Sequence, residues 1–123
     1  MNEDELIKRC LINSDAIVTY PFCDSKHKKF PVLRHKSNNK WFGLIFRLDG
    51  TLYINLKAQP QTIFALQDQY PDIITPAWHM NKTHWCKIDV EKINPKTLDA
   101  IIKISYDLTA KKEVVFCLTD KKL

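Results

Sequence analysis

Residues 79–85, His-Met-Asn-Lys-Thr-His-Trp, bring several side chains that could do chemistry into one short segment. Lys82 could meet a phosphate group as a point charge. Asn81 could hydrogen-bond a base edge, or it could hold a turn of the backbone. Trp85 and Trp78, which precedes the segment, could stack on an unpaired base, although Trp85 could instead belong to the core. His84 could hydrogen-bond a buried carbonyl group. The segment therefore predicts a nucleic-acid contact or, as the alternative, a structured turn before a strand.

Metal and nucleophile chemistry has weaker support in the sequence. His79, His84 and Cys86 form the only local cluster of zinc-type ligands, and the five-residue spacing of the histidines suits neither face of a helix. The Cys86 thiol beside His84 could act as a nucleophile only if its pKa were lowered. No pair of carboxylates stands out for acid–base catalysis. We therefore expect no catalytic residue, no metal and no cofactor.

The positive charge of the chain is concentrated in residues 25–47, which contain no Asp or Glu. The cations of this stretch are Lys26, Lys28, Lys29, Arg34, Lys36, Lys40 and Arg47. They contribute +7 to a net charge of +5, so the remainder of the chain sums to −2. Such a stretch attracts polyanions, and duplex DNA is the expected partner. The alternative is a solvated, lysine-rich strand edge that prevents aggregation.

Length and composition limit the classes of protein that fit. A chain of 123 residues predicts one domain spanning residues 1–123. Gly43 and Gly50 are the only glycines, which excludes a glycine-rich phosphate loop. No apolar run approaches the roughly 20 residues of a membrane span, and the acidic N-terminus does not look like a signal peptide. We therefore expect a cytoplasmic protein with no membrane partner, whose four cysteines are reduced thiols.

Hydrophobic periodicity predicts three helices and an antiparallel sheet. The predicted helices cover residues 2–13, 59–70 and 94–108. The predicted strands cover residues 29–36, 41–48, 51–57 and 84–90, with Asp49-Gly50 as a hairpin turn. The order helix, strands, helix, strand, helix gives an α+β domain whose helices pack on one face of the sheet. The other face stays open to water or to a ligand.

Alternation along the hairpin assigns its side chains to the two faces of the sheet. The inward rows are Phe42, Leu44 and Phe46 on one strand and Leu52, Ile54 and Leu56 on the other. The outward row is Tyr53, Asn55 and Lys57. We expect the last helix to bury Leu98, Ile101 and Ile102 against an inward row. The outward row is either a contact surface or an ordinary solvated sheet face.

Four stretches occur in the order and at the separation typical of one known family. They are Tyr20-Pro21-Phe22, Tyr53-Ile54-Asn55-Leu56-Lys57, residues 79–85 and Ser105-Tyr106-Asp107-Leu108. Over residues 3–110 the chain thus resembles the MmcQ/YjbR family, although Cys23 stands where that family usually has Gly. The resemblance implies a CyaY-like α+β fold, a curved antiparallel sheet covered by helices. It also implies a double-wing sheet similar to a phage transcription factor domain that binds DNA, with no established catalytic residues.

The CyaY-like fold is similar to that of frataxins, which bind iron through an acidic surface. The first predicted helix of this chain offers only Glu3, Asp4 and Glu5 for such a site. The helix dipole already favours acidic residues in a first turn, so the trio needs no metal to explain it. We therefore expect no iron site.

The leading prediction is a non-enzymatic cytoplasmic protein that binds DNA through basic wings. The predicted DNA-binding residues are Lys26, Lys28, Lys29, Arg34, Lys36, Lys40, Asn55, Lys57, Asn81, Lys82 and His84. The alternative is a protein-interaction module that uses the open sheet face. Binding of nucleic acid through lysines must weaken steeply with salt, and this property separates the two.

Overall fold

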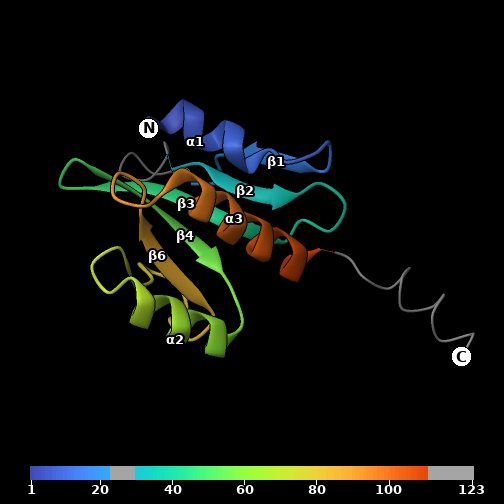
Figure 1. Ribbon diagram of the computed structural model, residues 1–123. Helices are drawn as coiled ribbons and strands as arrows, with labels where there is room; N and C mark the ends of the chain where they lie inside the picture. Colours follow the sequence, from blue (N-terminus) through green and yellow to red (C-terminus); the bar gives the residue numbers. More distant parts are fainter. Residues whose placement is uncertain (23–29, 111–123) are drawn as a thin grey trace, which may run out of the picture.

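Six antiparallel strands and three helices make up residues 1–22 and 30–110, the part of the chain that the computed structural model describes (Figure 1). The helices are α1 (Glu3–Cys10), α2 (Pro60–Gln69) and α3 (Pro95–Thr109). The strands are β1 (Ala16–Thr19), β2 (Val32–His35), β3 (Trp41–Leu48), β4 (Thr51–Lys57), β5 (Ile74–Pro76) and β6 (Trp85–Asp89). Their order across the sheet is β1-β2-β3-β4-β6-β5. The predicted α+β fold is confirmed.

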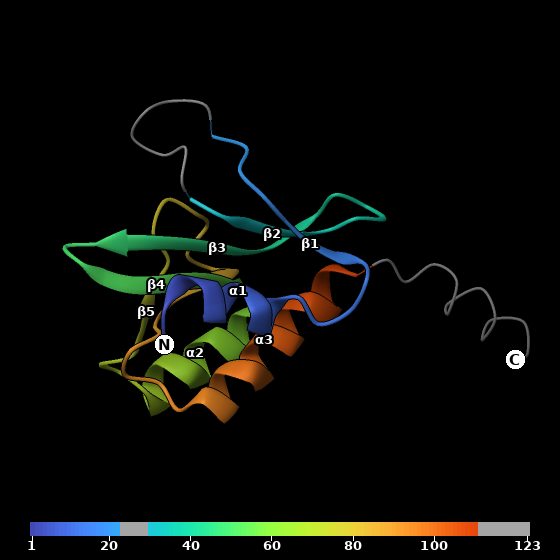
Figure 2. The same ribbon diagram turned by 90° about the horizontal axis from the view of Figure 1, so that it is seen from above.

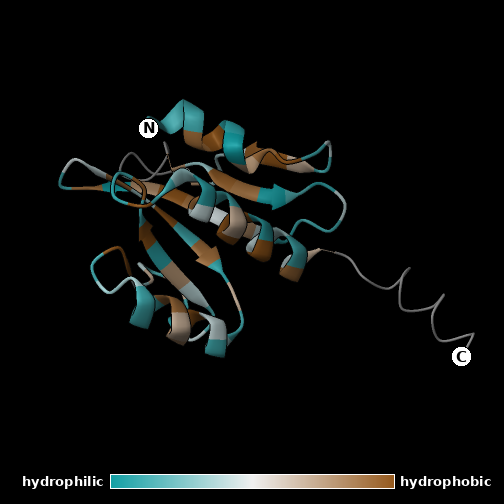
Figure 3. Ribbon diagram, viewed as in Figure 1, coloured by the Kyte–Doolittle hydropathy of each residue, from teal (hydrophilic) through white to brown (hydrophobic). Residues whose placement is uncertain are grey.

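The three helices lie on one side of the sheet, which we call the helical face (Figure 2). The loop between β5 and β6 lies on the other side, the second face, where its side chains pack against β3. Hydrophobic and hydrophilic residues alternate along α3, as expected for a helix that covers a sheet (Figure 3). In the described part of the chain, no helix is long and apolar enough to cross a membrane.

The hairpin of β3 and β4 matches the predicted ranges residue for residue. Its turn residues Asp49 and Gly50 both have positive φ angles, 50° and 85°. Two consecutive residues with positive φ form the type I′ turn, whose twist suits that of the strands it joins. The turn therefore fixes the register of the two central strands, from Leu48 opposite Thr51 to Gly43 opposite Leu56.

Two short strands and some element ends differ from the prediction. The sequence does not predict β1 and β5, because four residues and three residues ending in Pro76 give no clear alternation. The first helix ends at Cys10 instead of residue 13, since Leu11 has left the helical conformation. Its predicted cap is confirmed, because Asn2 Oδ1 accepts a hydrogen bond from the Glu5 N–H at 2.8 Å.

A β-bulge in β3 corrects the predicted inward row of that strand. Leu33 pairs with Gly43, whereas the next residue, Arg34, pairs with Trp41, so Phe42 is an extra residue in the ladder. An extra residue shifts the alternation of side chains between the faces. Phe42 joins the core under the helices, and Leu44 and Phe46 lie on the second face instead.

Helix α3 covers the sheet as the sequence predicts. Leu98, Ile101 and Ile102 are buried in the same cluster as the inward row of β4. The buried Ser105 hydroxyl donates to the Phe42 carbonyl at 2.6 Å and accepts from the Lys57 N–H at 2.9 Å. This serine therefore satisfies a backbone group at the bulge and ties α3 to both central strands.

Candidate functional site

The second face carries an aromatic cluster over β3, in addition to the polar row of β4 that the sequence predicts on this face. Val32, Leu44 and Phe46 are buried at its centre, with exposures of 0%, 3% and 2%. Seven partly buried side chains pack around them: Phe22, Phe30, Trp41, Leu48, Tyr53, Trp78 and Met80. Because the cluster draws on strands and on residues outside them, local sequence patterns do not reveal it.

Asn55 is fully buried beneath the loop between β5 and β6. Its Nδ2 donates to the Trp78 carbonyl at 2.7 Å, and its Oδ1 accepts from the Trp78 N–H at 3.3 Å. The predicted contact of Asn55 with DNA is therefore corrected, because its amide is already used by the backbone of Trp78. The side chain instead holds the loop against the sheet.

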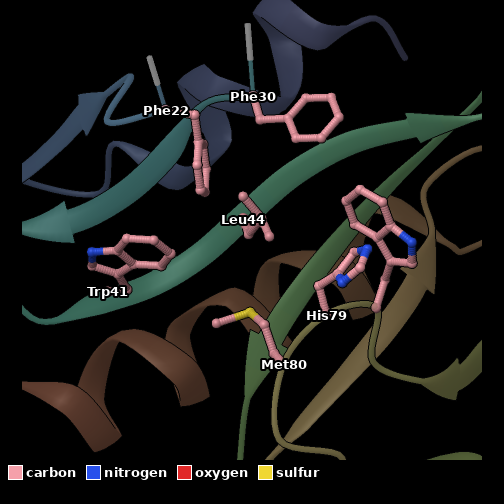
Figure 4. Close-up of a pocket in the computed structure, with 7 residues that line it drawn as sticks. Phe22, Phe30, Trp41, Leu44, His79 and Met80 are labelled. Atoms are coloured by element: carbon pink, nitrogen blue, oxygen red, sulfur yellow. The ribbon is translucent and has the colours of Figure 1, made fainter. Parts of the chain in front are cut away.

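A pocket of about 470 Å³ opens on this face (Figure 4). Its lining residues are Phe22, Phe30, Trp41, Leu44, Trp78, His79 and Met80. In Figure 4, Trp41 and His79 lie on opposite sides with Leu44 between them. The volume falls in the range of sites that hold small molecules, and the lining is mostly aromatic or aliphatic. The pocket can therefore accept a flat, largely apolar group.

Contacts between rings hold the walls of the pocket. Trp78 stacks on Phe46, with ring centroids 4.5 Å apart and an interplanar angle of 25°. Phe30 meets Trp78 edge to face at 5.6 Å, and Phe22 meets Trp41 in the same way at 6.1 Å. Such pairs are stabilising beyond the area that they bury. The rings are thus positioned before any ligand arrives.

Three consecutive residues of the β5–β6 loop, Trp78, His79 and Met80, line the pocket. Neighbouring side chains of an extended strand would point to opposite sides. His79 has a φ of 55°, a left-handed conformation that is uncommon outside glycine, and this turns the chain. Its exposed imidazole lies 4.3 Å from the Trp78 ring at 71°. His79 therefore adds hydrogen-bonding nitrogen atoms to a mostly apolar lining.

The remainder of residues 79–85 forms a turn that leads into β6. Asn81 Oδ1 accepts from the N–H of Thr83 at 2.8 Å and of His84 at 3.3 Å. Trp85 is 8% exposed and belongs to the core. Of the alternatives that the sequence left open, Asn81 therefore holds the turn and Trp85 belongs to the core. Lys82 and His84 are exposed.

Cationic side chains surround the aromatic cluster. The Arg34 guanidinium lies 5.9 Å from the centre of the Trp41 ring, and its Nε donates to the Thr19 hydroxyl at 3.1 Å. Lys40 is exposed directly before Trp41. Lys57 and Lys87 point to the second face from β4 and β6, opposite Trp85 and Asn55 in the register. The second face therefore has a positive rim.

The predicted DNA-binding residues are only partly brought together. Arg34, Lys40, Lys57, Lys82 and His84 are half-buried or exposed on the second face or its bordering loops. Lys36 is exposed in the β2–β3 turn. The last cation of the basic stretch, Arg47, lies at the far end of β3 and donates to the Gly50 carbonyl. Lys26, Lys28 and Lys29 lie outside the described residues.

Acidic side chains are concentrated on the opposite side of the molecule. The helices that cover the helical face carry Glu3, Asp4, Glu5, Asp68, Asp99 and Asp107. Among the described strand residues on the second face, Asp89 is the single acid, and it is buried and accepts from the Glu91 N–H. The same helices also carry Lys8, Arg9, Lys96 and Lys103, so four cations and six acids give the three helices a net charge of −2. The free charges of the second face are positive by contrast.

The model of the YjbR family matches residues 15–108, which is most of the chain. This chain belongs to the YjbR family. The resemblance seen in the sequence is thereby confirmed. Relatives with curated sequences include the uncharacterised protein YyaQ of Bacillus subtilis, 36% identical over 101 residues that cover 73% of this chain and 82% of YyaQ. The uncharacterised protein YbdF of Escherichia coli O157:H7 is 39% identical over 74 residues, 59% of this chain and 60% of YbdF.

Solved structures share the YjbR fold described above. A crystal structure from Pseudomonas syringae superposes with a TM-score of 0.74 at 27% identity, covering 89% of this chain and all of that one. The Deinococcus radiodurans protein DR2400 superposes with a TM-score of 0.73 at 26% identity, covering 89% and 78% of the two chains. Family membership thus establishes the fold, while none of these names states an activity or a ligand.

Several residues of the YjbR pocket escape sequence reasoning. Trp41, Leu44 and Met80 look like ordinary strand or loop residues, and the bulge at Phe42 conceals which face β3 presents. Lys87 can be assigned to the second face only once its pairing with Asn55 is known. One sequence signal does point to the site: Trp78 precedes the 79–85 segment, so an unusual run of aromatic and polar residues surrounds the loop.

Cysteine and metal chemistry find no support in the described part of this YjbR chain. Burial raises the pKa of the Cys86 thiol to about 12 and, with a contribution from Asp99, that of Cys10 to about 12. Both are free thiols, and at neutral pH they stay protonated and poorly nucleophilic. No group of three or more His, Cys, Asp or Glu side chains in the described residues is arranged to hold a metal ion.

Proposed function

We propose that this YjbR protein binds nucleic acid, DNA in the first place, through the second face of its sheet. The observation that carries the proposal is a preformed aromatic pocket on a face whose free charges are positive. Cations supply affinity for phosphates, and aromatic rings supply contacts with bases. In keeping with the sequence, we propose that this binding takes place in the cytoplasm.

The cations have the placement that backbone contacts require. Arg34 is held by Thr19 and by the Trp41 ring, so its guanidinium loses little freedom when a phosphate binds. Lys40 and Lys82 stand on separate loops next to pocket-lining residues. If a nucleic-acid strand crossed the pocket, these cations could therefore neutralise its phosphates on both sides of the pocket.

A fluorescence-anisotropy titration tests this proposal. A labelled DNA duplex of 20 base pairs with random sequence is titrated with the full chain at 50 mM and 200 mM salt. We expect weak, sequence-independent affinity, with a dissociation constant of about 1–100 μM at the higher salt. Three phosphate contacts would weaken binding by about 40-fold over this fourfold change in salt. No binding at 50 mM salt would contradict the proposal.

A second candidate function is recognition of a protein, and the apolar lining of the pocket favours it. An aromatic or aliphatic side chain of a partner would also fit between Trp41 and His79. Such a contact depends on apolar burial and changes little with salt. The salt dependence of the same titration therefore separates the two candidates.

A further inference from the structure

We infer that the aromatic pocket takes a single unpaired base, so that this protein prefers single-stranded over duplex nucleic acid. The inference rests on the proposed function and names its substrate class. It starts from the pocket itself: two half-buried indoles, Trp41 and Trp78, border a hollow of about 470 Å³. In a protein core, side chains would fill such a volume, because an empty apolar cavity lowers the free energy of unfolding.

The shape of the pocket suits a flat ring. Its floor is Leu44, 3% exposed, and Trp41 and His79 stand on opposite sides of that floor (Figure 4). Base–aromatic stacking is tolerant of sequence, because each base offers a π face to an indole. The pocket's size also fits one base and not a stack of paired ones, since both faces of a duplex base are already occupied by its neighbours.

The rim adds the polar contacts that a base needs. His79 has a left-handed φ of 55°, and its exposed imidazole lines the pocket edge-on to the Trp78 ring. Its ring nitrogens can donate to or accept from a base edge. An apolar protein side chain would make no use of this group. The hydrogen-bonding imidazole in the lining therefore favours a heteroaromatic occupant.

Cations on both sides of the pocket could contact the phosphate backbone of a nucleic-acid strand. Arg34 lies against Trp41 on one side of the pocket, and Lys82 lies two residues after Met80 on the other. These cations alone would favour duplex DNA, because its charge density along the axis is the higher. A preference for single strands would therefore have to come from the pocket and not from the charge.

Three labelled oligonucleotides of equal length separate base stacking from phosphate contact: a thymidine 12-mer, its duplex with adenosine, and an abasic 12-mer that keeps every phosphate. We expect the thymidine strand to bind about tenfold or more tightly than the other two, which is the value of one stacked base. Equal affinity for all three would overturn the inference while leaving the proposed function intact. Absence of binding to all three at 50 mM salt would overturn both.

A pair of variants locates the effect. Trp41→Leu removes one wall and keeps an apolar side chain in β3, and Phe64→Leu makes the same kind of change on α2, where Phe64 is 75% exposed on the helical face. We expect Trp41→Leu to lower affinity for the thymidine strand about fivefold or more. Affinity for the abasic strand should fall by clearly less, because only the contact between Trp41 and Arg34 is lost there. Phe64→Leu should change neither. Equal losses in both variants, or a loss for the abasic strand as large as for the thymidine strand, would overturn the assignment to the pocket.

Discussion

The side-chain amide of Asn55 pairs with the backbone of Trp78 through two hydrogen bonds, although 23 residues separate them in the sequence. The amide thus makes the pair of hydrogen bonds that the backbone of a neighbouring strand would make, and it holds the β5–β6 loop over the second face. Trp78 is held against Phe46 as a result, and one wall of the pocket is fixed. Asn55 is therefore a positioning residue for the pocket and not a ligand contact.

Replacing Asn55 by Ala should release this loop. Both backbone groups of Trp78 would lose their partner, which costs about 1–3 kcal/mol of the free energy of unfolding. Asn55→Asp should cost more, because it buries a negative charge and places a carboxylate oxygen against the Trp78 carbonyl oxygen. Urea unfolding measures the loss, and amide hydrogen exchange of the Trp78 N–H should accelerate. The matched control is Asn38→Ala, which removes a bond to the Thr109 carbonyl far from the loop. Unchanged exchange at Trp78 in both Asn55 variants would contradict this role.

Replacing Ile102 by Ala should destabilise the packing of α3 on the sheet. Ile102 is fully buried, so the truncation leaves a cavity and costs about 2–5 kcal/mol. Ile104 on the same helix is 40% exposed, and Ile104→Ala should cost about 1 kcal/mol or less. Urea denaturation of the two variants provides the comparison. A loss below about 0.5 kcal/mol at Ile102 would mean that α3 does not cover the sheet.

The fold was more accessible to sequence reasoning than the site was, for physical reasons. Asp49-Gly50 encodes its turn locally, because few residues other than Asn, Asp and Gly tolerate consecutive positive φ angles. The stripe of Leu98, Ile101 and Ile102 likewise follows from helical periodicity alone. These signals depend on neighbouring residues, so one sequence is enough to read them.

The pocket depends instead on contacts between distant segments. Its walls come from residues 22, 30, 41, 44 and 78–80, which only the sheet order brings together. The bulge at Phe42 reverses the faces expected for Leu44, and no local pattern marks it. Asn55 looked like an exposed polar residue of an alternating strand, because the loop that covers it lies more than 20 residues away.

The two buried thiols should resist modification in the folded protein. Burial raises the pKa of Cys10 and of Cys86 to about 12, so their thiolate fraction near pH 8 is very small. In a Cys23→Ser, Cys117→Ser background, we expect no rapid reaction with a thiol reagent at pH 8 and two reacting thiols in denaturant. Rapid labelling of either native thiol would contradict the buried placement.

The same shifts predict how stability changes with pH. An unfolded thiol releases its proton near pH 9, whereas the folded thiols keep theirs until about pH 12. Between these values the folded state binds more protons, so the free energy of unfolding should fall as pH rises above about 9. The measurement is urea unfolding at pH 8, 9 and 10. Cys86→Ala should reduce the slope, and an unchanged slope would show that Cys86 does not contribute.

Neutralising cations beside the pocket should weaken nucleic-acid binding alike for every sequence. Lys40→Gln with Lys82→Gln removes two exposed charges next to pocket-lining residues. If each lysine meets a phosphate, the slope of log affinity against log salt should shrink by about 0.9 per contact on duplex DNA and about 0.7 on a single strand. Stability should change by less than about 0.5 kcal/mol, because both side chains are exposed.

The matched control for these lysines is Lys8→Gln with Lys96→Gln, since both lysines are exposed on helices of the opposite face. This variant has the same net charge as the first one. If overall charge alone attracted the polyanion, the two variants would lose affinity equally and keep similar slopes. We expect the Lys40 and Lys82 variant to lose clearly more, because direct contacts, not the distant field, release counterions. Equal behaviour of the two variants would show that overall charge attracts the polyanion and would remove the second face as its binding surface.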